Sequence, residues 1–174
     1  MAELTGKKIA VLVEDGFEDL ELWYPVLRLR EAGAEVDVIG TGSAAEYRGK
    51  YGLSCPAEKN IAAVKAADYD GLIVPGGWAP DKLRRYGNIL DFVRDIFLAG
   101  KPVGAICHAP WVLISAKVLT GKTMTSTVAV KDDVENAGAT WVDRAVVVDE
   151  NLISSRRPAD LPDFCREFIA AFKQ

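Results

Sequence analysis

Three short apolar runs constrain the fold of this chain more than any other feature of its sequence. They lie within residues 7–13, 70–77 and 103–106, and each has the length and near-continuous hydrophobicity of a strand buried on both faces. A stripe at helical spacing separates the second run from the third, and it consists of Ile89, Phe92, Val93, Ile96 and Phe97. Strands that alternate with helices predict an α/β fold, in which a mostly parallel central sheet is flanked by helices on both faces.

Weaker signals extend this pattern over the rest of the chain. The expected elements are a helix ending at Gly33, a strand at 34–39, a hairpin excursion within 41–60, a short helix at 60–67, a weak strand at 123–127, a helix at 128–137, strands at 141–149 and 152–154, and a last helix that starts near Pro158. No linker, internal repeat or low-complexity segment interrupts them. The sequence therefore predicts a single domain over residues 1–174.

Charge and composition exclude several classes of function. The net charge of −4 and the pI of about 5.1 disfavour nucleic acid or an anionic membrane as a stable partner. No apolar run approaches the roughly 18 residues that span a bilayer, and the polar N-terminus gives no sign of a signal peptide. Three widely spaced cysteines indicate a reducing compartment, so a cytoplasmic location is expected.

The chain has a single histidine, His108, and this restricts the possible chemistry. Zinc sites built on several histidines are excluded, and no Cys-x-x-Cys pair offers another route to metal binding. We therefore expect no metal site. Any catalytic pairing of cysteine with histidine must use His108, which directly follows Cys107.

Cys107 lies where the third apolar run stops and a helical pattern begins. A reactive side chain at a sharp strand-to-helix turn is the architecture of a nucleophile elbow, and the small residues Gly104, Ala105 and Ala109 suit such a turn. The N-terminus of the following helix would favour thiolate over thiol. The alternative is a buried structural cysteine without chemistry. We assign that structural role to Cys165, which lies in the apolar stripe of the last helix, and regard Cys55 as a bystander.

Two further features are expected at the same edge of the sheet, because ligands gather at the carboxyl ends of parallel strands. One is the acidic turn with Glu18 after the first strand. The other is the Gly76-Gly77 turn after the second, where the absence of side chains permits close approach of a ligand and the backbone N–H groups can face a developing anion. The alternative for these glycines is a simple turn. The convergence favours a reactive Cys107.

Four motifs together resemble the ThiJ/PfpI superfamily, and most closely its PfpI-type intracellular branch. They are Ala105-Ile-Cys-His-Ala-Pro110, Val74-Pro-Gly-Gly-Trp-Ala-Pro80, Gly16-Phe-Glu-Asp19 and Ser154-Ser-Arg-Arg-Pro-Ala-Asp-Leu161. They occur in the family's order and cover nearly the whole chain. The resemblance implies a flavodoxin-like three-layer sandwich of the kind shared with class I glutamine amidotransferase domains.

The resemblance also implies roles for individual residues. Cys107 is the expected nucleophile, His108 the catalytic histidine, and Glu18 the carboxyl group that hydrogen-bonds the sulfur. The alternative for Glu18 is a carboxylate that stabilises the dipole at a helix N-terminus. The backbone N–H groups of Gly77 and His108 are the expected oxyanion hole. Asp81 takes the position of the acidic residue that, in protease-like members, reaches the histidine from a neighbouring subunit.

Two positions depart from the family pattern, and one contact needs a particular geometry. Ala109 replaces a common glycine, and Asp81 is one methylene shorter than the glutamate usual in protease-type members. Adjacent residues on a helix do not face one another, so a contact between Cys107 and His108 requires a non-helical elbow or help from subunit packing. Trp78 is expected as a wall of the substrate pocket or an interface anchor, or alternatively as an exposed loop aromatic.

We therefore expect a cofactor-independent cysteine enzyme of the stress response that acts on reactive carbonyls. Its substrates would be methylglyoxal, glyoxal or early glycation adducts, which a Cys107 thiolate would attack. The alternatives are an intracellular cysteine peptidase, a non-enzymatic redox-sensing stress protein or chaperone, and an inert structural domain. The resemblance further implies a homodimer or a hexamer.

Overall fold

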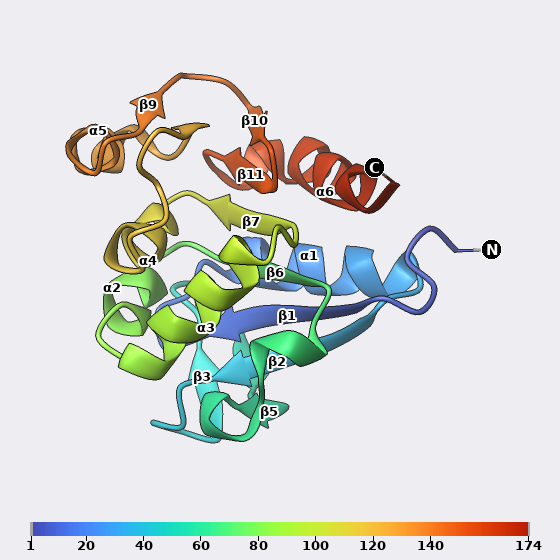
Figure 1. The fold of residues 1–174 in the computed structure, drawn as a ribbon. Coiled ribbons are helices and arrows are strands. Elements are labelled where there is room, and N and C mark those ends of the chain that lie inside the picture. Colours follow the sequence, from blue (N-terminus) through green and yellow to red (C-terminus); the bar gives the residue numbers. More distant parts are fainter. Residues whose placement is uncertain (1, 174) are drawn as a thin grey trace.

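A seven-stranded sheet forms the centre of the molecule (Figure 1). The computed structural model describes residues 2–173. The strand order is β10-β11-β7-β6-β1-β2-β5, and every neighbouring pair is parallel except β10 with β11. The strands are β1 (Lys8–Val13), β2 (Glu35–Gly40), β5 (Lys59–Asn60), β6 (Gly71–Val74), β7 (Val103–Ile106), β10 (Val146–Asp149) and β11 (Leu152–Ser155). The three apolar runs of the sequence became β1, β6 and β7.

Helices cover both faces of this sheet, which confirms the predicted α/β fold. They are α1 (Asp19–Glu31), α2 (Ala79–Leu83), α3 (Gly87–Leu98), α4 (Pro110–Ser115), α5 (Lys131–Asn136) and α6 (Leu161–Ala170). Helices α1 and α6 pack against one another on one face, and α3 lies on the other (Figure 1). Among the described residues, no helix is long and apolar enough to cross a bilayer.

Glycines within two central strands make room for the rings of α6. A Cβ added to Gly104 would lie 2.8 Å from the Phe164 ring, and one added to Gly71 would lie 3.3 Å from the ring of Phe168. Both phenylalanines are completely buried. The small strand residues therefore set how closely α6 approaches the sheet, and a close approach increases the apolar surface that folding removes from water.

Helix α1 presents to solvent apolar residues that recur at helical spacing in the sequence, among them Leu20 and Leu27. Leu20 and Leu27 are 53% and 60% exposed, whereas Leu22, Val26 and Leu29 of the same helix are buried. This helix carries apolar side chains on two faces, and the sheet can cover only one of them. The helical spacing therefore identified the element but not the face that packs.

Two short sheets lie outside the central one. The expected hairpin excursion is formed by β3 (Glu46–Arg48) and β4 (Ser54–Pro56), and β8 (Thr123–Met124) pairs in parallel with β9 (Thr140–Trp141).

Two predictions of local structure were wrong. The helix expected at 60–67 is instead a pair of 3-10 turns, Ile61–Ala63 and Ala66–Asp68, because Val64 and Lys65 between them adopt extended backbone. The strand expected at 141–149 is divided between β9 and β10, with a segment between them in which Asp143 pairs with Arg156.

The parallel strands bring their carboxyl ends to one edge of the sheet. Val74 of β6 is in register with Ala105 of β7, and Ile106 of β7 with Ser155 of β11. The segments that follow these strands therefore begin side by side.

Candidate active site

Cys107 forms a sharp turn between β7 and α4. Its φ of 63° lies in the left-handed region, which is unusual for a residue with a Cβ. Two backbone hydrogen bonds hold the turn: the Cys107 N–H donates to the Ser155 carbonyl at 3.1 Å, and the Thr127 N–H donates to the Cys107 carbonyl at 3.2 Å. Strained backbone of this kind occurs at active sites, where surrounding structure maintains it.

The left-handed turn brings the side chains of two successive residues together. The Cys107 Sγ lies 3.2 Å from the Nδ1 of His108. A helical backbone would have turned these side chains apart. The sequence left two possible causes for this contact, a non-helical elbow or subunit packing. The contact forms within one chain, so the non-helical elbow is sufficient to orient the two side chains.

The Gly76-Gly77 turn approaches the elbow closely. Gly77 has a φ of 78°, and a Cβ at this position would lie 2.4 Å from the backbone nitrogen of Glu18. Only glycine fits here. The Gly77 and His108 N–H groups face the Cys107 sulfur, and they act to lower the pKa of its thiol. These are the two donors expected to form the oxyanion hole.

The sequence predicted that the Gly76 N–H would face a developing anion, but in the structure it binds a carboxyl group of the protein. Its N–H donates to the Glu21 Oε2 at 3.0 Å and so does not face a substrate. A Cβ at Gly76 would lie 2.3 Å from that oxygen and 2.6 Å from the Cys107 Cβ. Gly76 therefore lets the carboxyl group and the cysteine approach each other.

Glu18 does not contact the cysteine sulfur, and the structure corrects this assignment. Its side chain caps helix α1, because Oε2 accepts a hydrogen bond from the Glu21 N–H at 2.8 Å. The carboxyl group beside Cys107 belongs to Glu21, one helical turn further on and completely buried. Glutamate is not a preferred capping residue, so the sequence contained no capping-box signal that distinguished Glu21 from Glu18.

Burial determines the protonation of this pair. It raises the pKa of Glu21 to about 8, and the negative charge of Glu18 adds to the effect. Burial is also the main reason why the pKa of the Cys107 thiol is raised to about 12, and the charge of Glu21 contributes once that carboxyl group ionises. At neutral pH the Glu21 carboxyl therefore keeps its proton, and the thiol keeps its own until a base removes it. The sequence predicted that the helix N-terminus would favour the Cys107 thiolate, whereas burial in the folded protein favours the thiol.

His108 is placed to act as that base. Burial lowers the pKa of its imidazole, and the positive charge of Lys50 lowers it further, so the ring is neutral near pH 7. The ring centroid lies 5.5 Å from that of Trp78 and 5.0 Å from that of Trp111. Trp78, which is half exposed, thus lies beside the histidine, and its role as a wall of the substrate pocket stays a prediction. The Lys50 Nζ lies 4.9 Å from the Trp78 ring centroid. No sequence motif indicated Lys50, because it lies in the β3–β4 hairpin, distant in the chain from His108.

Asp81 has another partner within the chain. It forms an ion pair with Arg85, one turn further along, and both side chains are largely exposed. Its expected contact with His108 of a neighbouring subunit stays a prediction. Within residues 2–173, no group of three or more histidine, cysteine, aspartate or glutamate side chains is arranged to hold a metal ion.

The fold and this site together define an α/β protein with a cysteine at a nucleophile elbow. The chain belongs to the DJ-1/PfpI family, whose model matches residues 7–171, and this confirms the resemblance noted in the sequence. A Pyrococcus furiosus protein named Deglycase PfpI is 43% identical over 95% of this chain and 99% of its own length. The Thermococcus kodakarensis protein named Deglycase TK1284 is 44% identical over 93% of this chain and 97% of its own.

Solved structures agree with this assignment. A two-domain protein from Anabaena variabilis, described as containing DJ-1/ThiJ/PfpI-like and ferritin-like domains, matches with a TM-score of 0.93. It is 42% identical to this chain and covers 96% of it, whereas the match spans 48% of that protein. Drosophila melanogaster DJ-1beta matches with a TM-score of 0.88 at 30% identity, over 94% of this chain and 88% of the other.

Proposed function

We propose that this protein is a cofactor-independent cysteine enzyme that converts α-oxoaldehydes and early glycation adducts to hydroxy acids. The observation that carries the proposal is the 3.2 Å contact between the Cys107 Sγ and the Nδ1 of a neutral His108. A base in hydrogen-bond reach of a protonated thiol supplies the thiolate that attack on a carbonyl needs. The relatives named deglycases support the same reaction class.

The first step forms a bond between the sulfur and the aldehyde carbon. His108 accepts the thiol proton, the thiolate attacks, and the carbonyl oxygen gains the electron pair of the broken π bond. The N–H groups of Gly77 and His108 stabilise this oxyanion, which then takes up the proton to give a hemithioacetal. With a glycation adduct, the sulfur displaces the amine or thiol at the same carbon and reaches the same hemithioacetal.

The second step moves a proton between adjacent carbons. A base removes the hydrogen on the carbon bound to sulfur, and the neighbouring carbonyl carbon receives a proton, so that a thioester of the hydroxy acid results. His108 and the protonated Glu21 are the acid–base groups placed for this transfer. Water then hydrolyses the thioester, releases the acid and restores the Cys107 thiol. Methylglyoxal and one water thus give lactate without an oxidant or a reductant.

Lactate formation from methylglyoxal tests the proposal. Wild type should form lactate, and Cys107→Ser should reduce kcat at least about 100-fold, because hydroxyl is a far weaker nucleophile than thiolate. Cys55→Ala, a buried cysteine in the β3–β4 hairpin, is the matched control and should keep the wild-type rate. Absence of turnover by wild type, or full activity of Cys107→Ser, would refute the reaction.

One observation favours a second candidate, a redox-sensing protein. The buried Glu21 Oε1 has no hydrogen-bond partner in the described chain, and it can bind an oxygen added to the sulfur. Stoichiometric modification of Cys107 by peroxide, in a protein that forms no lactate, would select this function. The peptidase alternative ranks lower, because Asp81 is engaged by Arg85.

A further inference from the structure

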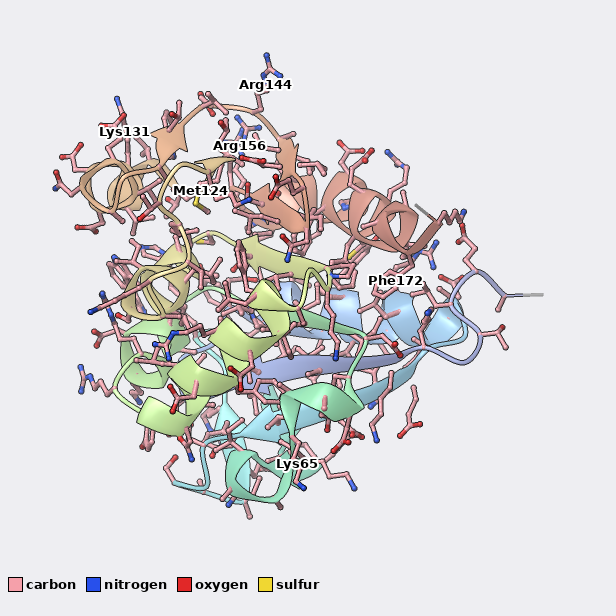
Figure 2. All side chains as sticks on the ribbon, in the orientation of Figure 1. Lys65, Met124, Lys131, Arg144, Arg156 and Phe172 are labelled. Atoms are coloured by element: carbon pink, nitrogen blue, oxygen red, sulfur yellow. The ribbon has the colours of Figure 1, made fainter. Side chains whose placement is uncertain are left out.

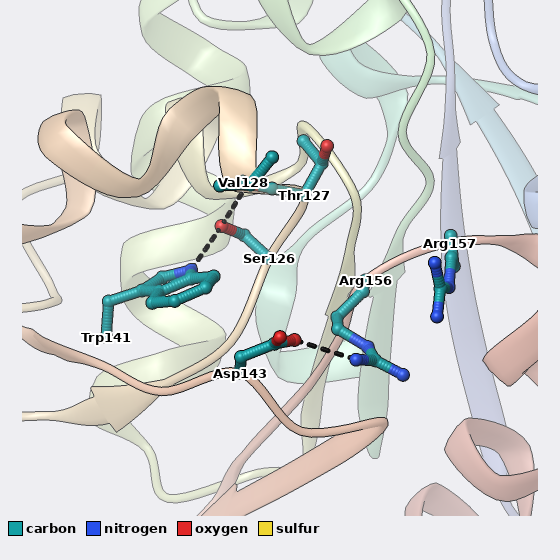
Figure 3. A pocket seen from close by; sticks show the side chains of 7 residues that line it. All are labelled: Ser126, Thr127, Val128, Trp141, Asp143, Arg156 and Arg157. Carbon is teal, nitrogen blue, oxygen red and sulfur yellow. Dashed lines mark hydrogen bonds and ion pairs between the residues drawn. The ribbon is translucent and has the colours of Figure 1, made fainter.

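We propose that a groove beside the elbow binds the carboxylate or phosphate of the amine or thiol that the enzyme releases from a glycation adduct. The inference rests on the proposed function and names the substrate class of the same site. The groove has a volume of about 260 Å³ and is shown in Figure 3. We call it the Arg157 groove; its lining residues are Ser126, Thr127, Val128, Trp141, Asp143, Arg156 and Arg157.

Both rims of the Arg157 groove are attached to the elbow by hydrogen bonds. The Thr127 N–H donates to the Cys107 carbonyl, and the Cys107 N–H donates to the carbonyl of Ser155, which directly precedes Arg156. Cys107 itself does not line the groove. A substrate whose reacting carbon lies at the sulfur can therefore extend its other end into the neighbouring groove.

The charges of the Arg157 groove leave one guanidinium available to a ligand. Arg156 donates to Asp143 at 2.7 Å and to the buried Asp160 at 2.9 Å, so its charge is already compensated. Figure 3 shows the pair of Arg156 and Asp143 joined by a dashed line, with Arg157 beside it. Within residues 2–173, the one ion pair of Arg157 is a 4.0 Å approach to Asp160, a carboxylate that Arg156 already holds. The Arg157 side chain is 64% exposed.

The chemistry of the walls specifies the ligand. A guanidinium presents planar paired donors that match a carboxylate or a phosphate. Opposite it stands Trp141, whose Nε1 donates to the Ser126 Oγ at 3.0 Å, so that the indole is held in place. The half of the adduct that leaves after attack by Cys107 would thus carry its anion to Arg157, as a free amino acid or a nucleotide can.

Matched pairs of substrates test this assignment. The hemithioacetals of methylglyoxal with N-acetylcysteine and with N-acetylcysteine amide differ in one carboxylate, and the methylglyoxal adducts of guanosine 5′-monophosphate and guanosine differ in one phosphate. Wild type should show a kcat/KM about tenfold higher for at least one anionic member, the gain expected of one partly exposed charge-assisted contact. The pair that responds identifies carboxylate or phosphate as the natural group. Equal rates within both pairs would overturn the proposal.

Variants locate the effect within the molecule. Arg157→Gln should bring the anionic-to-neutral ratio close to one. Arg144→Gln is the control, because Arg144 points outward at the rim of the molecule (Figure 2) and does not line the groove; it should keep the wild-type ratio. If Lys50→Gln removes the preference and Arg157→Gln preserves it, the anion binds beside His108, and the groove assignment is wrong.

A binding measurement tests the groove independently of turnover. The Cys107→Ala protein should bind N-acetylcysteine, or guanosine 5′-monophosphate, about tenfold more tightly than the matching neutral compound, as followed by Trp141 fluorescence against a Trp141→Phe reference. Arg157→Gln in this background should abolish the difference. Equal binding in both pairs would refute the groove even in an active enzyme, whereas an inactive wild type that still shows the difference would refute only the proposed reaction.

Discussion

Glu18 and Glu21 lie one helical turn apart at the start of α1, yet their surroundings give them different roles. Glu18 accepts a backbone N–H at the start of α1, and Glu21 lies beside the sulfur with a raised pKa. Both carboxyl groups belong to a short acidic segment in which the sequence favoured Glu18. The distinction depends on which of them the Gly76 N–H reaches, and only the folded chain fixes that contact.

Amide substitutions should separate these roles. Glu21→Gln removes the proton that the carboxyl holds at neutral pH, so kcat/KM should fall about 100-fold, a typical contribution of general acid–base catalysis. Glu18→Gln keeps an oxygen that can cap the helix and should change kcat/KM less than about threefold. Steady-state kinetics with methylglyoxal measure both effects. A larger loss for Glu18→Gln would return the acid–base role to Glu18.

The charge of Lys50 should be visible in the pH dependence of the reaction. Because Lys50 lowers the pKa of His108, Lys50→Met should raise that pKa. The imidazole would then stay protonated to a higher pH, and the acidic limb of the kcat/KM profile would shift upward. Lys65→Met, on the exposed turn before β6 (Figure 2), is the control and should leave the limb in place. A limb that does not move in Lys50→Met would contradict His108 as the base.

At the scale of elements, the turns after β1 and β6 form one hydrogen-bonded unit beside the elbow. An isolated β-bridge joins Phe17 to Gly77, and the Trp78 N–H donates to the Gly16 carbonyl at 2.7 Å, so the loops after β1 and β6 are bonded together. The side chains of the site are thereby held on backbone that is itself hydrogen-bonded. Such support is what maintains a strained elbow.

Gly77→Ala should disrupt this unit. The added Cβ would meet the Glu18 backbone nitrogen at 2.4 Å, so the turn must move and its N–H must leave the sulfur. Removal of one oxyanion donor should lower kcat about 100-fold or more. Gly121→Ala is matched, because Gly121 has the same φ of 78° but open space around it. It should cost about 1 kcal/mol of stability and retain activity. Equal kinetics for the two variants would show that the clash does not reach the site.

The order of elements followed from the sequence, whereas the contacts between them did not. Runs such as 103–106 predicted strands because burial on both faces requires continuous apolar residues, and the single histidine limited the base to His108. The left-handed φ of Cys107 and the approach of Lys50 to Trp78 depend on tertiary packing. No local pattern specifies either. The exposed face of α1 was misleading for the same reason, since Leu20 and Leu22 are equally apolar.

For the whole molecule, Glu21 links the site to global stability. Its pKa is about 8 in the folded state against 4.5 for an ordinary glutamate. Between these values the unfolded chain releases a proton that the folded chain retains, so this group makes folding less favourable as the pH rises through that range. Below about pH 4.5 both states hold the proton, and the penalty vanishes.

The unfolding free energy of Glu21→Gln minus that of wild type should therefore increase between pH 4 and pH 9. The increase should be on the order of a few kcal/mol. Urea denaturation at a series of pH values would measure this. The difference should grow between about pH 4.5 and 8 and stay constant above. A difference that does not vary with pH would show that Glu21 ionises normally in the folded protein.

Because Cys55 and Cys165 are buried, thiol labelling of the folded protein can count the molecules whose Cys107 is free to react. These two thiols are 0% and 1% exposed, whereas Cys107 is reachable from solvent. A bulky maleimide should label one thiol per folded chain and three per denatured chain. Under native conditions the ratio of labelled thiol to protein should be one when every chain is folded with a free Cys107; unfolded chains raise this ratio, and oxidation of Cys107 lowers it. Turnover rates can thus be expressed per reactive Cys107, and this count itself requires no substrate.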